Sequence, residues 1–92
     1  MRIVLSRHAR QRLFERSVPV EAVTRIVEEG RTILRYDDDK PYPSRLVLGY
    51  DGERPVHILI AENAEANETI VITAYEPSAD VWLPGWTQKK RP

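Results

Sequence analysis

Hydrophobic residues recur at two different spacings along the chain, and the change falls at Gly30. Before Gly30 the spacing is helical, because Ala9 and Leu13 lie four residues apart and a second apolar face recurs at Val20, Val23, Ile26 and Val27. After Gly30, apolar and polar residues alternate, as they do in half-buried strands. The pattern therefore predicts two N-terminal helices followed by a β-sheet.

The ends of both helices can be placed from capping residues. The first helix is expected from Ser6 to about Arg16, because a serine hydroxyl accepts from the free N–H groups of a helix start. The second is expected to begin at Pro19, since proline suits the first helical position. It should run to about Glu29, with Gly30 as a left-handed C-cap. The short turn between the helices predicts an antiparallel helical hairpin.

Four strands are expected after Gly30, at residues 32–36, 44–50, 55–61 and 69–76. The dipeptide Asp51-Gly52 is a hairpin turn signal between the second and third of them. The segment Ile3–Leu5 is either a short edge strand or an apolar lead-in. This order predicts one α+β domain over residues 1–92, with the helical hairpin packed on a four-stranded antiparallel sheet. Residues 83–92 are expected to be a mobile basic tail.

The loop between the last two strands suggests a register for their pairing. If they pair about a loop centred near Glu65, His57 falls opposite Thr73, and Leu59 falls opposite Val71. Under this register His57, Thr73 and Tyr75 share one face of the sheet. A slip of one residue would turn every side chain to the other face.

Charge is distributed unevenly, although the chain as a whole has a net charge of zero. Residues 1–35 carry +4, residues 36–82 carry −7 and the tail carries +3. Every basic residue of the helical part is arginine, whose planar fork matches phosphate. A local arginine patch is compatible with a focused RNA contact, whereas the neutral total argues against broad nucleic-acid affinity.

The composition also limits the classes of site and location. The chain has no cysteine, which excludes disulfides, zinc–thiolate sites and a thiol nucleophile. No segment approaches the roughly 20 apolar residues of a membrane span, and Ile3–Leu5 is too short for a signal peptide. We therefore expect a cytoplasmic protein that does not bind a membrane.

The first predicted helix carries the clearest candidate chemistry. His8, Arg12 and Arg16 recur every four residues, and Glu15 lies beside them. We call these four residues the His8–Arg16 ridge. An imidazole, two guanidiniums and a carboxylate on one ridge can bind a phosphate or move a proton. The alternative is a solvated helix face with a few ion pairs.

His57 and Tyr75 are the second pair of candidates. His57 stands between Val56 and Ile58 in an apolar strand, so it is either a hydrogen-bonded core histidine or a catalyst. The chain has no glycine-rich phosphate loop and no paired ligand spacing for a metal, so we expect neither a cofactor nor a metal. What remains is metal-independent acid–base chemistry, in which arginines stabilise charge.

A resemblance to a known family rests on three motifs. They are His8-Ala9-x-x-Arg12-x-x-Glu15-Arg16, then Arg54-Pro55-Val56-His57, then Ile72-Thr73-Ala74-Tyr75-Glu76-Pro77 together with Trp82, and the Val23–Val27 helix lies between the first two. With these motifs the chain resembles an uncharacterised domain-of-unknown-function family of short bacterial and archaeal proteins. That family is in turn similar to the BrnT and RelE/ParE group of type II toxins. The chain departs from the family pattern at Ser17 and Pro19, which affects the turn between the helices.

The resemblance implies a toxin of a toxin–antitoxin pair, acting as an endoribonuclease on messenger RNA. By this resemblance the family's motif positions fall on His8, Arg12, Glu15, Arg16, His57 and Tyr75. We take His8, His57 and Tyr75 as the catalytic candidates, with His8 or His57 transferring the proton and Tyr75 orienting or stacking. We assign Arg12 and Arg16 to phosphate binding, and Glu15 to holding an arginine in place. The implied partners are a cognate antitoxin encoded nearby and RNA, free or on the ribosome; the oligomeric state is open. The alternative is a non-catalytic protein-interaction module of a small bacterial regulatory pair.

Overall fold

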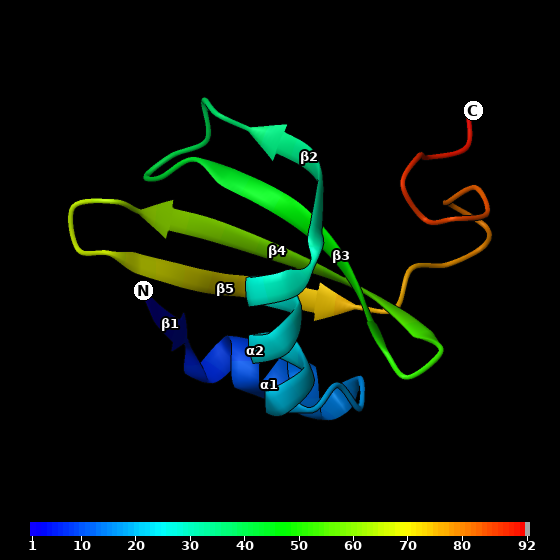
Figure 1. The fold of residues 1–92 in the computed structure, drawn as a ribbon, viewed down its shortest axis with the longest axis horizontal. Helices are drawn as coiled ribbons and strands as arrows, with labels where there is room; N and C mark the ends of the chain where they lie inside the picture. The colour runs from blue at the N-terminus through cyan, green and yellow to red at the C-terminus, as the bar shows by residue number, and fades with distance from the viewer. Residues whose placement is uncertain (92) are drawn as a thin grey trace.

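The computed structural model describes residues 1–91, in which two helices and five strands form one α+β domain (Figure 1). In chain order the elements are β1 (Arg2–Leu5), α1 (Arg7–Glu15), α2 (Val20–Glu29), β2 (Arg31–Tyr36), β3 (Ser44–Asp51), β4 (Arg54–Asn63) and β5 (Glu68–Tyr75). The strands lie in the order β1-β5-β4-β3-β2. The predicted α+β class is thus confirmed.

The expectation of a four-stranded antiparallel sheet is wrong, because β1 joins the sheet and makes it mixed. Strands β2 to β5 pair antiparallel with their neighbours, but β1 pairs parallel with β5, from Arg2 opposite Glu68 to Leu5 opposite Val71. Of the two alternatives for Ile3–Leu5, the structure shows the edge strand. The apolar side chains of Ile3 and Leu5 pack against the core, and this contact stabilises the short strand at the edge of the sheet.

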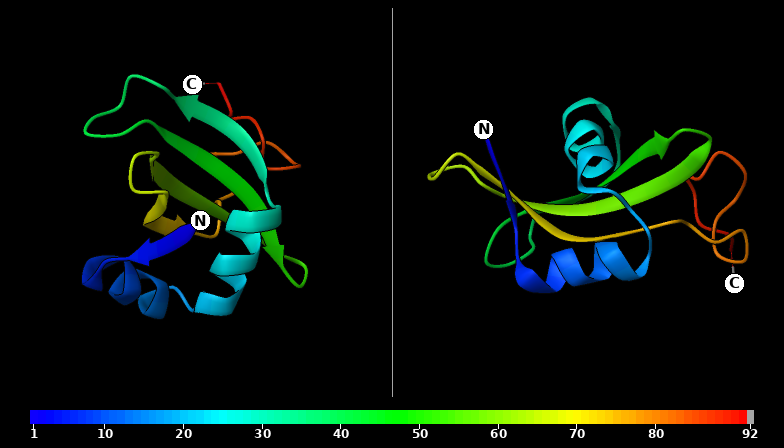
Figure 2. Two further views of the ribbon diagram at one scale, coloured as in Figure 1. Left: turned by 60° about the vertical axis from the view of Figure 1, so that its left-hand side comes forward. Right: turned by 90° about the horizontal axis from the view of Figure 1, so that it is seen from below.

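Both helices cover the same face of the sheet, but each packs on different strands. Helix α1 contacts β5 and β1, whereas α2 contacts β3 and β4 (Figure 2). The two helices therefore pack on the sheet rather than side by side as the predicted hairpin. The core between the layers is formed by buried apolar side chains from both helices and from β3, β4 and β5, among them Leu13, Val23, Ile26, Val47, Ile58 and Val71.

The capping predictions have mixed outcomes. Ser6 caps α1 as expected, since its Oγ accepts from the N–H of Ala9 at 3.0 Å. Pro19 is the N-cap of α2 rather than its first helical residue. Gly30 is extended, with φ −71° and ψ 170°, so the predicted left-handed cap is wrong. A Cβ at Gly30 would lie 2.5 Å from the Ile26 carbonyl oxygen, and this close approach of chain segments explains the glycine.

The register between β4 and β5 differs from the assumed one. His57 lies opposite Tyr75 and Leu59 lies opposite Thr73, two positions away from the assumed partners, with a bulge between Leu59 and Ile60. A shift of two residues preserves the face on which a side chain lies. His57 and Tyr75 therefore still share a face, and this face is the one opposite the helices.

The C-terminal segment covers part of that second face (Figure 1). Trp82 pairs with Lys89 as an isolated antiparallel bridge, and the Trp86 N–H donates to the Leu83 carbonyl. Trp82 is buried, which anchors the segment to the sheet. The predicted mobility of the tail stays a prediction.

Candidate functional site

The His8–Arg16 ridge is formed as predicted along one side of α1. The Arg12 Nε donates to His8 Nε2 at 3.4 Å, and Arg12 Nη1 lies 3.7 Å from Glu15 Oε2. His8 and Glu15 are exposed, and the Arg12 side chain is 44% exposed, so these groups can reach a ligand. Exposed pairs of this kind contribute little to stability, which leaves the three side chains free to exchange partners.

Arg16 differs from the other members of the ridge because it is tied to the sheet. Its Nη1 donates to Thr73 Oγ1 and to the Ala74 carbonyl oxygen, both at 2.9 Å. These bonds lie on β5 beyond the end of β1, where no strand of the described residues 1–91 pairs with β5 on that side. Arg16 therefore links the ridge to the end of β5, next to Tyr75.

Arg54, at the start of β4, holds the end of the ridge in place. Its guanidinium donates to the Arg16 and Ser17 carbonyl oxygens, both at 2.6 Å, and pairs with Glu76 Oε1 at 2.6 Å. Sequence reasoning quoted Arg54 only as part of a motif and gave it no role. The conformation it stabilises is demanding, because Ser17 has a positive φ of 55°. Arg54 thus positions the turn between the helices.

His57 is fully buried, and both of its ring nitrogens have partners. Nε2 lies 2.8 Å from the Trp86 carbonyl oxygen, and a carbonyl can only accept, so Nε2 carries the proton. Nδ1 is then the acceptor for the Tyr75 hydroxyl, which donates over 3.3 Å. The ring also meets Trp82 edge-on, with centroids 4.4 Å apart. This geometry is that of a hydrogen-bonded core histidine that joins β4, β5 and the C-terminal segment.

Burial shifts the pKa values of this pair in opposite directions. It lowers the pKa of His57 below 6.5, and the hydrogen bond to the Trp86 carbonyl partly opposes this effect. Burial raises the pKa of Tyr75 above 10; nearby Tyr36 raises it further, and the Arg16 charge lowers it. At neutral pH a neutral imidazole therefore accepts from a protonated phenol, which is the arrangement the distances require.

The predicted site residues fall into two groups on opposite sides of the sheet. His8, Arg12 and Glu15 lie on α1 and Arg16 is its C-cap, while His57 and Tyr75 lie together on the second face. Arg16 is the connection between them through Thr73. Sequence reasoning missed Trp86, because its contribution is a backbone carbonyl, which no side-chain pattern reveals.

A comparison with protein-family models matches residues 5–76, which is most of the chain, to the domain of unknown function DUF4258. The chain belongs to this family. The resemblance to a domain-of-unknown-function family is thereby confirmed, whereas the comparison shows no link to BrnT or RelE. The DUF4258 match ends at Glu76, before Trp82 and Trp86. No curated protein and no solved structure matches the chain.

Two further findings concern metals and membranes. Among residues 1–91, no three histidine or carboxylate side chains gather closely enough to hold a metal ion. Within the same residues, neither α1 nor α2 is long and apolar enough to cross a bilayer.

Proposed function

We propose that the protein is a metal-independent endoribonuclease and acts as the toxin of a type II toxin–antitoxin pair. The observation that carries the proposal is the continuity of the His8–Arg16 ridge with the end of β5. The ridge begins with the exposed His8 imidazole and Arg12 guanidinium on α1 and ends at Arg16, which bonds to Thr73, two residues before Tyr75. The Arg16 charge is close enough to lower the pKa of Tyr75. This strip combines groups that bind phosphate with groups that transfer protons.

Each group has a role consistent with its surroundings. Arg12 can bind a phosphate bidentately, because its partners among residues 1–91 are the exposed His8 and Glu15. Arg16 is held by Thr73 and stabilises charge from a fixed position. Proton transfer falls to His8, which is exposed. We assign His57 the role of orienting Tyr75, since both of its nitrogens are engaged.

The chemistry assigned to these groups is transfer of the RNA phosphodiester to its own 2′-oxygen. His8, as the base, removes the 2′-hydroxyl proton, and the 2′-oxygen bonds to phosphorus. The bond from phosphorus to the 5′-oxygen then breaks. The leaving oxygen takes a proton from an acid, and the two guanidiniums neutralise the charge of the transition state.

The test is cleavage of a defined single-stranded RNA by purified protein in the presence of EDTA, followed by mapping of the new ends. We expect cleavage with EDTA present, its loss in H8Q, and weaker RNA binding in R12A. R10A is the matched control, because Arg10 is another exposed arginine of α1 but lies outside the ridge. R12A should reduce the slope of log affinity against log salt by about 0.7, the value for one phosphate contact with a single strand. Intact RNA, or equal defects in R10A and R12A, would refute the proposal.

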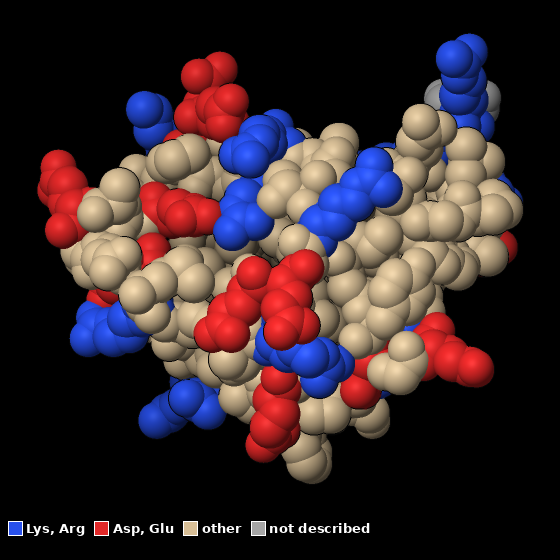
Figure 3. Space-filling view, in the orientation of Figure 1, with Lys and Arg blue, Asp and Glu red and all other residues tan. Residues whose placement is uncertain are grey.

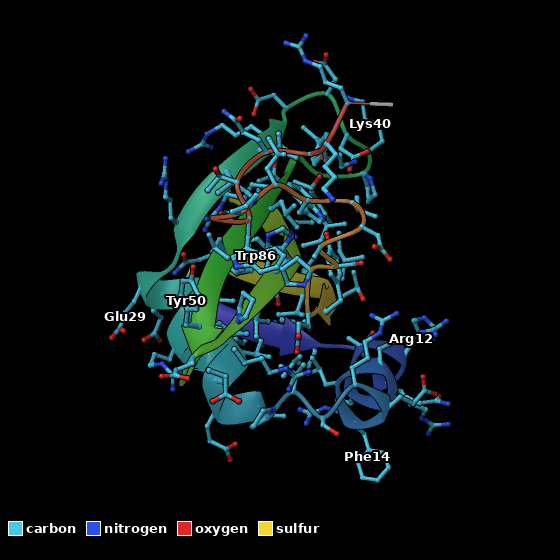
Figure 4. The ribbon with its side chains drawn as sticks, turned by 90° about the vertical axis from the view of Figure 1, so that its right-hand side faces the viewer. Arg12, Phe14, Glu29, Lys40, Tyr50 and Trp86 are labelled. Carbon is cyan, nitrogen blue, oxygen red and sulfur yellow. The ribbon has the colours of Figure 1, made fainter. Side chains whose placement is uncertain are left out.

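Phe14 favours a second candidate function, that of a protein-interaction module. Its side chain is 86% exposed and points away from the sheet on the outer side of α1 (Figure 4). Exposed phenylalanine beside arginines is typical of an anchor for a protein partner. We propose an acidic antitoxin segment as this partner, passing around α1 to contact both the His8–Arg16 ridge and Phe14, which point to different sides of the helix.

Co-purification with the product of a small neighbouring gene tests the partner directly. Binding should weaken with salt, because exposed charge pairs are screened. It should also weaken in F14A and in the double variant R12A/R16A. If the partner binds R12A/R16A as well as it binds wild type, the ridge is not its site. Healthy growth and intact messenger RNA on induced expression would favour the interaction module over the toxin.

A further inference from the structure

A pocket of about 170 Å³ opens on the sheet face opposite the helices. Apart from Ser44, its lining consists of aromatic, apolar and basic side chains from four strands and the C-terminal segment, namely Tyr36, Leu46, Leu59, Tyr75, Trp82 and Lys89. Tyr36 is 42% exposed and Trp82 is buried, so the pocket has an outer wall and an inner wall. None of these residues belongs to the His8–Arg16 ridge.

The chemistry of the lining suits a flat aromatic ring that is attached to an anion. The exposed Tyr36 ring offers a stacking surface, Tyr75 and the buried Trp82 form an aromatic inner wall, and two leucines form an apolar floor. Lys89 supplies a cation, since its Nζ lies 5.7 Å from the centroid of the Trp82 ring. The volume is below the roughly 300 Å³ of pockets that enclose drug-sized ligands, so it matches one ring system.

The inner part of the pocket is also preorganised. The Tyr75 hydroxyl is fixed by its hydrogen bond to His57, and the His57 ring in turn packs edge-on against Trp82. Binding therefore orders few additional side chains, which lowers its entropic cost.

We propose that this pocket binds a nucleobase, with Lys89 near the phosphate attached to it. Aromatic side chains on a β-sheet stack on unpaired bases in a sequence-tolerant way, and a neighbouring cation tracks the backbone. The inference rests on the proposed function, for which it supplies a second contact with the RNA. The base can come from an RNA strand or from a free nucleotide, and the experiment below separates the two.

The first experiment follows the two indole N–H signals by NMR during titrations. Trp82 lines the pocket and Trp86 does not, and a W86F variant assigns the signals. The titrants are AMP, UMP, ribose 5-phosphate and a short single-stranded RNA. We expect the Trp82 signal to move and saturate with the nucleotides and the RNA. Ribose 5-phosphate, which has no base, should leave it in place. The proposal would be overturned if no nucleotide shifted the Trp82 signal, or if ribose 5-phosphate shifted it as much as the nucleotides do.

The second experiment uses two pairs of matched variants. Y36A should weaken binding about tenfold, as expected for a lost stacking contact. Y50A is its control, because Tyr50 is a similarly exposed tyrosine, at 46%, on another strand and outside the pocket (Figure 4). K89M should weaken the binding of RNA, with K90M as its control. Equal effects of Y36A and Y50A would contradict the assignment, and circular dichroism of each variant verifies that it folds.

The outcomes separate this proposal from the proposed function. If nucleotides shift the Trp82 signal but the protein leaves RNA intact, the proposed nuclease activity is refuted and the nucleobase pocket stands. If wild type and Y36A cleave RNA equally well and the Trp82 signal does not move with nucleotides, the nucleobase pocket is refuted and the proposed nuclease activity stands. Tighter binding of RNA than of AMP would identify the strand as the source of the base, and the reverse order would identify a free nucleotide.

Discussion

Replacing His57 by leucine tests whether this residue holds the C-terminal segment on the sheet. The substitution places an apolar side chain in a fully buried position and removes the hydrogen bonds to Tyr75 and to the Trp86 carbonyl. Both partners are only partly buried, so each lost bond costs about 1 kcal/mol. Loss of the edge-on contacts with Trp82 and Tyr75 adds about 0.5–1.5 kcal/mol.

We therefore expect H57L to lower the free energy of unfolding by about 2–4 kcal/mol. For a domain of this size the melting temperature should fall by roughly 10–25 °C. The assay is urea unfolding followed by tryptophan fluorescence. H8L is the matched control, because His8 is the other histidine and is exposed, and its effect should stay within about 0.5 kcal/mol.

A double-mutant cycle isolates the His57–Tyr75 bond. Y75F alone leaves the buried Nδ1 without a donor, whereas H57L/Y75F removes both partners, so the double variant should be more stable than the sum of the single effects indicates. The reasoning is refuted if H57L unfolds like wild type, or if the two effects simply add. It is also refuted if H57L does not increase tryptic cleavage after Lys89 and Lys90.

Two further predictions follow from burial and close packing. Burial lowers the pKa of His57 in the folded state, so the unfolded chain binds more protons than the folded chain below pH 6.5. The contribution of His57 to the free energy of unfolding should therefore be complete above pH 6.5 and decrease as the pH falls towards the folded-state pKa. The slope from this residue is at most about 1.4 kcal/mol per pH unit. Urea midpoints between pH 5 and 8 measure this slope, which H57Q should reduce and H8Q should retain; equal slopes in both variants would exclude His57 as its source. At Gly49, an added Cβ would lie 2.5 Å from two atoms of the Ile26 side chain, so G49A should cost about 1–3 kcal/mol through overpacking. The cost should shrink when measured in an I26A background, and an unchanged cost there would show that Ile26 is not the obstacle.

The parts of the fold that follow local rules were predictable from the sequence. Helical spacing gave both helices, and Ser6 marked the start of α1 through its hydroxyl. The four long strands were found to within two residues at their ends, because alternation and the Asp51-Gly52 signal are local features. The His8–Arg16 ridge was equally predictable, since it depends only on the four-residue helical repeat.

The parts that depend on distant segments were not predictable. Three apolar residues at Ile3–Leu5 carry no periodicity, so nothing local indicated a parallel pairing with β5. The β4–β5 register combines a four-residue connection with a bulge at Leu59/Ile60, and neither has a sequence signal of its own. The partner of His57 Nε2 is a backbone carbonyl 29 residues away. The position of His57 could be read from the sequence, but its partners could not.

Charged side chains of both signs are interspersed over the face shown in Figure 3, in keeping with a net charge of zero. This arrangement lacks the broad single-signed field that attracts nucleic acid at long range. On this face, recognition would therefore depend on short-range contacts at defined positions.

The bond from Arg16 to the Ala74 carbonyl has a consequence for the behaviour of the protein at high concentration. Strand β1 ends opposite Val71, which leaves the last residues of β5 without a neighbour on that side, and Ile72 there is 40% exposed. An unpaired apolar strand edge is a template for the addition of a strand from another molecule. The Arg16 guanidinium donates to the Ala74 carbonyl oxygen on this edge. A strand that paired here would have to displace or desolvate this charged group, which costs free energy. We therefore expect Arg16 to oppose edge-to-edge pairing at this end of β5, whatever ligand the rest of the ridge binds.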